Sequence, residues 1–355
     1  MPQPKFEKIL CIRADNMGDV IMASPAIRAL KETFGSHITL LTSRAGSLIC
    51  KNLDCLDDTI VTDLPWVRSD GCDGSELVAL TGELRQRNFD AAVIFTVYSQ
   101  TSFPAAMLAF MAGIPVRVAY ARENPYQLLT HWVPDPEPFE EITHQVERDL
   151  SLVAKLGAGT ADDHLLLRVN DAEKHSFRQK LGEIGMDTAQ PYLLFHPGVS
   201  EQKREYPVEY WIGAGRLLAR EYYGLPILVS GSGGEKRLAD TIAEGIGEPA
   251  VSVAGMLSLG EFISLIEGAR CVVSVNTATI HIAAATQTPV VVLYAQTNPQ
   301  HTPWKSPHLI LPFSVPEHLK STNSIIRYVS DQLYATHIPY PDPAEIFIAA
   351  GHFLG

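Results

Sequence analysis

The chain has 355 residues, of which 46% are hydrophobic and 19% are charged. This length exceeds that of a typical single domain, so we expect two domains, and the composition excludes an intrinsically disordered chain. A formal net charge of −12 at pH 7 argues against a nucleic-acid partner, because the phosphate backbone binds positively charged surfaces.

Cysteine usage and hydropathy indicate the cellular compartment. The five cysteines are odd in number and include no Cys-x-x-Cys pair, so neither a zinc site nor a disulfide framework is expected, and a reducing compartment fits best. The N-terminal segment MPQPKFEKIL lacks the apolar core of a signal peptide. No apolar run approaches the ~20 residues that a membrane span needs. We expect a soluble, cytoplasmic protein, for which peripheral contact with the inner membrane surface stays open.

Strand and helix patterns alternate through the N-terminal half of the chain. Apolar runs predict strands at residues 9–13, 37–42, 91–95 and 116–120. Helical spacing predicts helices over residues 20–34, around residues 77–84, before residue 112 and over residues 143–156. Between residues 124 and 141 the periodicity breaks, and the prolines of residues 134–138 predict irregular backbone there.

The C-terminal half repeats this alternation. Strands are expected at residues 192–196, 226–230, 251–253, 271–275 and 290–294, and helices at residues 172–184, 208–222, 235–246, 259–268 and 343–353. The whole pattern predicts two doubly wound, Rossmann-like α/β domains facing each other across a cleft. We place them at residues 1–170 and 171–340, followed by a C-terminal helix at 341–355.

The first motif, RADNMGDVIMASPAIRAL, directly follows the first predicted strand. Gly18 permits a tight turn or a close approach of the backbone. Asp19 has two interpretations. It is an N-terminal capping carboxylate if the helix begins beside it. It is a general base facing the cleft if the helix begins instead at Ser24-Pro25, which also has the sequence of a helix start. The sequence leaves both open.

The second motif, HPGVSEQKREYPVEYW, follows the strand expected at residues 192–196. Gly198 and Ser200 lie at its carboxyl end, and Lys203 and Arg204 come next. Small residues beside cations suit a pyrophosphate, because N–H groups and a hydroxyl position it and a cation offsets its charge. An exposed loop with solvated cations is the alternative. His196 is more readily explained as a structural histidine.

Two weaker signals follow the next strands. The segment GSGGE of residues 231–235 forms a glycine-rich turn in which Glu235 either accepts hydrogen bonds from ribose hydroxyls or caps the helix. Met256, after Gly255, either touches a nucleotide base or packs its own loop.

The segment from residue 271 to residue 294 reads as strand, polar turn, alanine-rich helix and strand. Either Asn276 or Thr277 caps this helix, and both choices expose the N–H groups that follow. In parallel α/β sheets, phosphate-bearing ligands bind at such helix starts. Thr279 and His281 lie in the first turns, where His281 is placed to reach a phosphate or a sugar hydroxyl, with a structural role as the alternative.

Together these motifs resemble glycosyltransferase family 9, the ADP-heptose:lipopolysaccharide heptosyltransferase family. The resemblance spans residues 9–304. Its carriers in this sequence are Arg13, Met17-Gly18-Asp19-Val20, Pro25-Ala26, Leu30, His196-Pro197-Gly198, Lys203-Arg204, Pro207, Trp211, Ser274-Val275-Asn276-Thr277-Ala278, His281-Ile282-Ala283-Ala284-Ala285 and Thr288-Pro289-Val290.

The resemblance implies a GT-B fold, with an acceptor-binding N-terminal domain and a donor-binding C-terminal domain. It implies an inverting transfer that needs neither a metal nor a cofactor. Asp19 would be the base, with Gly18, Arg13 and Asn16 beside it on the acceptor side. Lys203 best matches the cation that offsets charge on the leaving diphosphate, and Arg204 is the alternative.

On the donor side, the resemblance implies a diphosphate or sugar site. Its residues would be Gly198, Ser200, Arg204, Asn276, Thr277, Ala278, Thr279 and His281, with Glu235 at the ribose and Met256 beside the base. Two positions depart from the family pattern. Asn276 stands where many members have Asp, and Ala278 stands where Gly is usual, which suggests a different donor or acceptor.

The expected partners are a nucleotide sugar, with ADP-heptose as the leading donor, and a glycan or glycolipid acceptor such as lipopolysaccharide core. Alternatives are a small-molecule or other surface-glycan acceptor, a sugar-nucleotide epimerase or hydrolase with the same fold, and a silent nucleotide-sugar-binding protein. Candidate acceptor contacts in the N-terminal half, which the sequence does not rank, are Arg44, Tyr98, Gln100 and Arg122.

Overall fold

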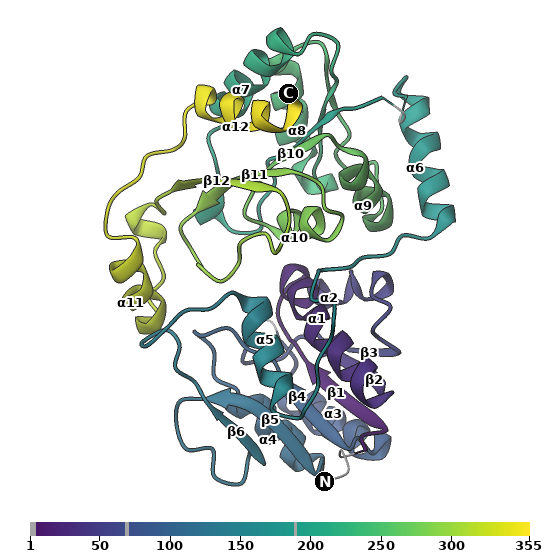
Figure 1. Ribbon diagram of the computed structural model, residues 1–355, viewed down its shortest axis with the longest axis vertical. Coiled ribbons are helices and arrows are strands. Elements are labelled where there is room, and N and C mark those ends of the chain that lie inside the picture. The colour runs from purple at the N-terminus through teal and green to yellow at the C-terminus, as the bar shows by residue number, and fades with distance from the viewer. Residues whose placement is uncertain (1–4, 68–70, 188–189) are drawn as a thin grey trace. The chain divides into compact units, whose positions relative to one another are not determined.

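The computed structural model of the protein describes residues 5–67, 71–187 and 190–355. The chain forms two compact units, unit 1 (Met1–Leu166) and unit 2 (Leu167–Gly355). Each unit contains a six-stranded parallel sheet with helices on both faces (Figure 1). This confirms the predicted doubly wound α/β class for both halves. The first four residues of the N-terminal segment lie outside the described part of the chain.

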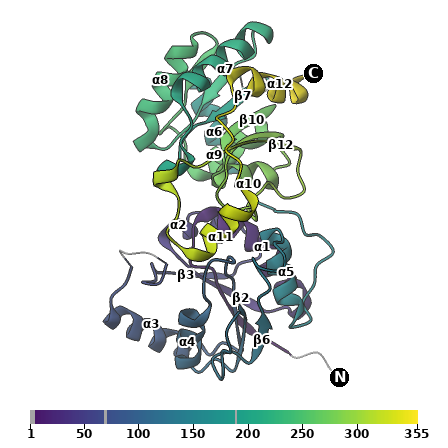
Figure 2. The ribbon, with the colours of Figure 1, turned by 90° about the vertical axis from the view of Figure 1, so that its left-hand side faces the viewer.

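The sheet of unit 1 has the order β3-β2-β1-β4-β5-β6. Its strands are β1 (Lys8–Ile12), β2 (His37–Thr42), β3 (Asp58–Val61), β4 (Ala91–Ile94), β5 (Val116–Ala121) and β6 (His131–Pro134). Its helices are α1 (Met17–Phe34), α2 (Arg44–Ser47), α3 (Gly74–Arg87), α4 (Phe103–Met111) and α5 (Gln145–Ala154). Helices α3 and α4 cover one face, and α1 and α5 pack together on the other (Figure 2).

The sheet of unit 2 has the order β12-β11-β10-β7-β8-β9. Its strands are β7 (Leu193–His196), β8 (Ile227–Val229), β9 (Ala250–Ser252), β10 (Cys271–Val275), β11 (Val290–Ala295) and β12 (His308–Phe313). Its helices are α6 (Asp171–Glu183), α7 (Val208–Glu221), α8 (Lys236–Ile246), α9 (Leu259–Gly268), α10 (Ala278–Ala285), α11 (Ser324–Leu333) and α12 (Pro343–Leu354). No described helix has both the length and the apolarity needed to cross a bilayer.

The central strands carry the core because both of their faces are covered. In β10, all five residues are buried, and Cys271, Val273 and Val275 face the helices α7, α8 and α12. Strands buried on two faces read as continuous apolar runs. That is why the predicted strands at residues 37–42 and 271–275 coincide with β2 and β10.

Edge strands account for the errors of the prediction. Strand β6 lies within the stretch expected to be irregular, and β3 and β12 were not expected at all. All three pair on one side only, and their residues are mostly half-exposed or exposed, so they lack a continuous apolar run. Pro134 is the last residue of β6, where an edge strand tolerates a proline because the missing N–H would face solvent.

Candidate functional site

Helix α1 begins at Met17, and Pro25 lies inside it. The alternative helix start at Ser24-Pro25 is therefore wrong. A proline inside a helix leaves the carbonyl four residues earlier without its N–H donor. Here that carbonyl belongs to Ile21, and the Ser24 hydroxyl donates to it at 2.7 Å. This local bond offsets the loss and lets the helix continue through the proline.

Asp19 occupies the third position of α1 and is held from two sides. Its Oδ2 accepts the N–H of Asn16 at 3.1 Å, and its Oδ1 accepts a hydrogen bond from Nη2 of Arg13 at 2.9 Å. The side chain is 14% exposed. Asn16 is the N-cap, so Asp19 is not the N-cap itself but completes a capping box with Asn16. A fully buried guanidinium orients its carboxylate, which stays partly exposed, so this capping contact does not exclude a role as a base.

Arg13 lies among three carboxylates. Besides Asp19, its Nε is 3.3 Å from Oδ2 of Asp15, and Asp149 of α5 interacts with its charge. Asp15 in turn accepts a hydrogen bond from Nε2 of Gln100 at 2.5 Å. Burial raises the pKa of Asp15, although Arg13 opposes the shift. One cation facing three acids favours keeping a proton on the most deeply buried one.

That acid is Asp149. Its Oδ1 accepts a hydrogen bond from Gln145 at 2.8 Å, and its Oδ2 is buried without a hydrogen-bond partner among the described residues. Burial raises the pKa of Asp149 to about 7, against the lowering effect of Arg13. The folded protein therefore keeps this proton at pH values where the unfolded chain has released it.

Asp149 should make the free energy of unfolding fall as pH rises. Because the folded state binds the extra proton, stability should drop by up to ~1.4 kcal/mol per pH unit between the unfolded and folded pKa values, and level off above pH ~7. Asp149→Asn keeps an acceptor for Gln145 but has no proton to lose. We therefore subtract the variant's free energy of unfolding from that of the wild type, both measured by urea unfolding. This difference should decrease from about pH 5 to about pH 7. A pH-independent difference would contradict the assignment of the proton to Asp149.

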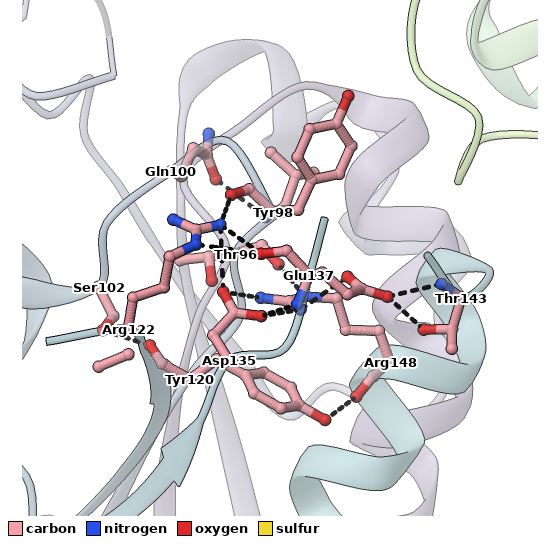
Figure 3. Close-up of polar contacts among 12 residues, drawn as sticks. Thr96, Tyr98, Gln100, Ser102, Tyr120, Arg122, Asp135, Glu137, Thr143 and Arg148 are labelled. Atoms are coloured by element: carbon pink, nitrogen blue, oxygen red, sulfur yellow. Dashed lines mark hydrogen bonds and ion pairs between the residues drawn. The ribbon is translucent and has the colours of Figure 1, made fainter. Parts of the chain in front are cut away.

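A second buried network, centred on Arg148, holds the loop after β4 and the proline-rich segment after β6 (Figure 3). Arg148 of α5 is 2% exposed and forms a two-pronged pair with Asp135, at 2.8 and 3.0 Å, and a contact of 2.7 Å with Glu137. Its Nε donates to the Thr96 carbonyl at 3.0 Å. Arg122 donates to the carbonyls of Glu137 and Tyr98. The network therefore ties the loop after β4 to α5 and to the proline-rich segment.

In unit 2, the loop after β7 is built around Glu235. A Cβ at Gly198 would lie 2.3 Å from Oε1 of Glu235, so a larger residue at this position would displace the carboxylate. Oε2 of Glu235 accepts the N–H of Ser232 at 2.6 Å, which confirms the capping interpretation. His196 is held by Ser230, with its Nδ1 3.0 Å from Oγ. Burial lowers the pKa of His196 to about 4, so it is neutral at neutral pH, as expected of a structural histidine.

Thr277, not Asn276, is the N-cap residue of α10, although its side chain accepts no helix N–H among the described residues. Asn276 is 6% exposed. Its amide donates to the Ala295 carbonyl and accepts the Ala295 N–H, both at 3.1 Å, and also donates to Thr297 Oγ1. The side chain thus joins the carboxyl ends of β10 and β11. An aspartate would lack the N–H group for the Ala295 carbonyl, which gives a structural reason for Asn at this position.

Asn276→Asp should lower the free energy of unfolding by about 1–3 kcal/mol. The buried Ala295 carbonyl would lose its donor, the Asn276 amide N–H, and a carboxylate would be buried in place of a neutral amide. Thermal and urea unfolding would measure it. Asn323→Asp is a matched control, since Asn323 is an exposed N-cap whose carbonyl oxygen accepts from Ile325 and Ile326. Aspartate caps equally well there. Equal stability losses in the two variants would contradict the role assigned to Asn276.

The two cations of the second motif share the carboxylate of Glu201 but differ in their other contacts. Nη1 of Arg204 donates to the Asn276 carbonyl at 3.0 Å, directly beside the start of α10. Its Nε is buried and has no hydrogen-bond partner in the described part of the chain. Lys203 contacts Glu201 at 2.8 Å, and Glu201 also contacts Arg204 at 2.8 Å. Of the two, Arg204 is the cation that the structure places at the helix start. Ser200, four residues before Arg204 in the chain, is exposed.

The remaining predicted residues of unit 2 lie near the same sheet edge. Thr279 and His281 are buried in the first turns of α10, and the His281 ring lies 6.3 Å from that of His301. Lys180 of α6 donates to the Met256 carbonyl at 2.9 Å and thereby anchors the loop after β9. Gly255 has φ +75° and approaches Gly233 closely, so the loops after β8 and β9 are in contact.

Comparison with known proteins decides the family. The family model described as "Glycosyltransferase family 9 (heptosyltransferase)" matches residues 77–320. The chain belongs to glycosyltransferase family 9. It is therefore a glycosyltransferase, as the motifs led us to expect.

Family 9 relatives match nearly the whole chain. Lipopolysaccharide heptosyltransferase 2 of Escherichia coli K12 is 26% identical over 310 residues, covering 83% of this chain and 85% of that protein. Among solved structures, a family 9 glycosyl transferase from Veillonella parvula has a TM-score of 0.79 at 16% identity, covering 99% and 98% of the two chains. The E. coli ADP-heptose lps heptosyltransferase II has a TM-score of 0.71 at 21% identity, covering 98% of each. These similarities confirm the predicted GT-B fold.

The family motifs did not reveal the acidic surroundings of Arg13. Asp15 stands within the first motif but was not singled out, and Asp149 lies about 130 residues further along the chain. One signal was present. In α5, Gln145, Arg148 and Asp149 are spaced so that they share the face with Leu152 that is buried in the structure. Polar residues on an apolar helix face indicate a buried network or a site.

Proposed function

We propose that this family 9 member is an inverting, metal-independent transferase that moves a heptose-like sugar from a nucleoside-diphosphate donor, ADP-heptose first, to a hydroxyl of a glycan acceptor such as lipopolysaccharide core. The observation that carries the proposal is the Asp19 carboxylate, oriented by Arg13 and Asn16 at the end of β1. The heptosyltransferase relative at 26% identity supports the sugar class.

In the proposed step, Asp19 accepts the proton of the acceptor hydroxyl as its oxygen bonds to the anomeric carbon. The bond between that carbon and the diphosphate oxygen breaks on the opposite face, which inverts the configuration. The electron pair leaves with the diphosphate, so no covalent enzyme intermediate is needed. A general base of this kind typically contributes 10²–10⁴-fold to the rate.

The leaving diphosphate would bind at the start of α10. The N–H groups of Ala278 and Thr279 are in the first turn, where no intrahelical acceptor exists, and helix starts favour anions. Arg204, held beside this start by the Asn276 carbonyl, would offset the charge with a charge-assisted hydrogen bond. Lys203 is the second cation, Glu235 the candidate ribose contact, Met256 the candidate base contact and His281 a candidate sugar or phosphate contact.

The test is donor consumption by the full-length protein. ADP-heptose, GDP-sugars and UDP-sugars are each supplied with and without a heptose-containing core oligosaccharide, in the presence of EDTA. We expect release of ADP that requires the acceptor and an inverted anomer in the product. Release without acceptor would instead indicate a hydrolase.

Binding gives an independent readout. A donor present at 100 times its Kd should stabilise the protein by ~2.7 kcal/mol. Absence of a thermal shift with every ADP- and GDP-sugar would contradict the donor assignment. Arg204→Met should reduce the ADP-heptose shift more than Lys203→Met does, if Arg204 is the main diphosphate contact.

A further inference from the structure

A pocket of about 210 Å³ lies within unit 1. It forms where the sheet order changes direction, between β1 and β4. The loop after β1 leads to β2 on one side, and the loop after β4 leads to β5 on the other. In doubly wound sheets, such diverging loops leave a crevice at the carboxyl ends of the strands, and ligands bind there.

A hydrogen bond ties together the two loops that form this pocket. Asp15 follows β1, Gln100 follows β4, and both line the pocket. Nε2 of Gln100 donates to Oδ1 of Asp15 at 2.5 Å. The loop after β4 is also held from behind, because Arg148 binds the Thr96 carbonyl and Arg122 binds the Tyr98 carbonyl (Figure 3). The pocket is therefore preformed by bonds that do not involve a ligand.

The lining has the composition of a sugar site. Its apolar lining residues include Ile12 and Ile94, the last residues of β1 and β4, and the half-buried Trp66. Three of the lining residues, Thr96, Ser99 and Thr101, carry hydroxyl groups. An aromatic wall with a few placed polar groups is typical of small-molecule pockets. Since a cavity of ~150 Å³ holds one benzene ring, this volume suits a single sugar ring.

Charge distinguishes this pocket from an anion site. Asp15 is the one residue with a formal charge among the described residues that line it. Arg13 pairs with Asp15 but is fully buried, and it shares its charge with Asp19. Two cations that the sequence offered as acceptor contacts have other partners. Arg44 pairs with Asp63, and Arg122 donates to the carbonyls of Tyr98 and Glu137. An anionic ligand would therefore meet a carboxylate and no compensating cation from this lining.

We propose that this pocket binds an uncharged sugar ring of the acceptor, and that Asp15 excludes acceptor sugars that carry a carboxylate or a phosphate at that position. The inference rests on the proposed function, because it assigns the acceptor class of that reaction. The Arg13 guanidinium, 3.3 Å away, and the hydrogen bond from Gln100 favour the charged form of Asp15 against the effect of burial. The carboxylate accepts a hydrogen bond from a sugar hydroxyl, which its charge strengthens. Trp66 contacts the apolar side of the ring.

The experiment is ligand-observed NMR titration of the full-length protein. The probes are the methyl glycosides of mannose, glucose and galactose, and as anionic counterparts mannose 6-phosphate and methyl glucuronide. We expect at least one neutral glycoside to bind and its anionic counterpart to bind at least ~10-fold more weakly, since like charges repel strongly at short range in a partly buried site. Asp15→Asn should reduce this preference to within about 2-fold, because the charge is its cause.

Two tryptophan variants complete the test. Trp66→Ala should weaken neutral-sugar binding by about 10-fold, the usual size of a lost aromatic contact. Trp132→Ala on the edge strand β6 removes an indole that is 43% exposed and should leave binding unchanged. Anionic sugars binding as well as neutral ones, no neutral glycoside binding, or an unaffected Trp66→Ala variant would each overturn the proposal.

Turnover separates this proposal from the proposed function. If acceptor-dependent ADP release occurs but the pocket variants change neither sugar binding nor the acceptor KM, the pocket assignment fails while the transferase stands. If the neutral-sugar preference is found but no nucleotide sugar is consumed, the binding site stands and the transferase assignment fails.

Discussion

Asp19→Asn should lower kcat by about 10²–10⁴-fold, the contribution of a positioned general base. This corresponds to roughly 3–5 kcal/mol of activation free energy. Asparagine still offers one oxygen to Arg13 or to the Asn16 N–H, so the helix start should survive. It has no basic oxygen for the hydroxyl proton. Steady-state kinetics with ADP-heptose measure the change, and a thermal shift with donor should remain as in wild type.

The matched control for Asp19→Asn is Glu32→Gln. Glu32 is an exposed carboxylate on the same helix, so its loss changes the net charge equally without touching Arg13. We expect kcat within about 2-fold of wild type, since a distant exposed charge is screened by salt. Near-normal turnover in Asp19→Asn, with the fold intact, would show that another group removes the proton.

Arg148→Met should destabilise unit 1 by about 3–5 kcal/mol, because a buried ion pair loses its central cation. Asp135 is left with the longer contact to Arg122, at 3.4 Å, and Glu137 with hydrogen bonds from Thr143 in place of an opposite charge. The variant also loses the cation that lies 4.2 Å over the ring of Tyr120 and the donor to Thr96. For a unit of this size, the melting temperature should fall by roughly 6–20 °C. Hydrogen exchange of peptides from α5 and β5 locates the loss.

Arg85→Met provides the comparison within the same unit. Arg85 is exposed, and its side chain donates a hydrogen bond to the Met111 carbonyl at 2.6 Å. A change at such a site should cost no more than about 1 kcal/mol. Equal stability of the two arginine variants would contradict this prediction, because it would mean that Asp135 and Glu137 do not need Arg148.

Strand prediction succeeded in the middle of each sheet and at the edge strand β9, and failed at the other three edges. β2 and β10 coincide with continuous apolar runs, because helices cover both of their faces. β3, β6 and β12 each have one edge without a neighbouring strand. Their sequences mix apolar and polar residues, so from the sequence alone they resemble loops. The prolines at residues 134–138 strengthened this misreading, although Pro134 itself ends a strand.

The sequence also left two local choices open that contacts settled. The position of Asp19 depended on where α1 begins, and the bond from Ser24 to the Ile21 carbonyl lets the helix run through Pro25. The N-cap of α10 was either Asn276 or Thr277. The amide of Asn276 instead exchanges hydrogen bonds with the backbone of Ala295 in the neighbouring strand. Ser24 could have been suspected from its place before a proline, but no local pattern pairs Asn276 with Ala295.

The amino-acid sequence was sufficient for the α/β class of both halves, for the family, and for which predicted strands the motifs containing Asp19, Gly198 and the start of α10 follow. These depend on short-range signals, namely apolar runs, helix starts and glycine turns. Tertiary packing alone decided that Arg13 serves Asp15, Asp19 and Asp149, that Arg204 rather than Lys203 reaches the Asn276 carbonyl, and that Glu235 lies against Gly198. Asp15 and Asp19 belong to the same β-α unit as Arg13, but the other pairings join residues from different β-α units, which only the folded sheet brings within a few ångströms.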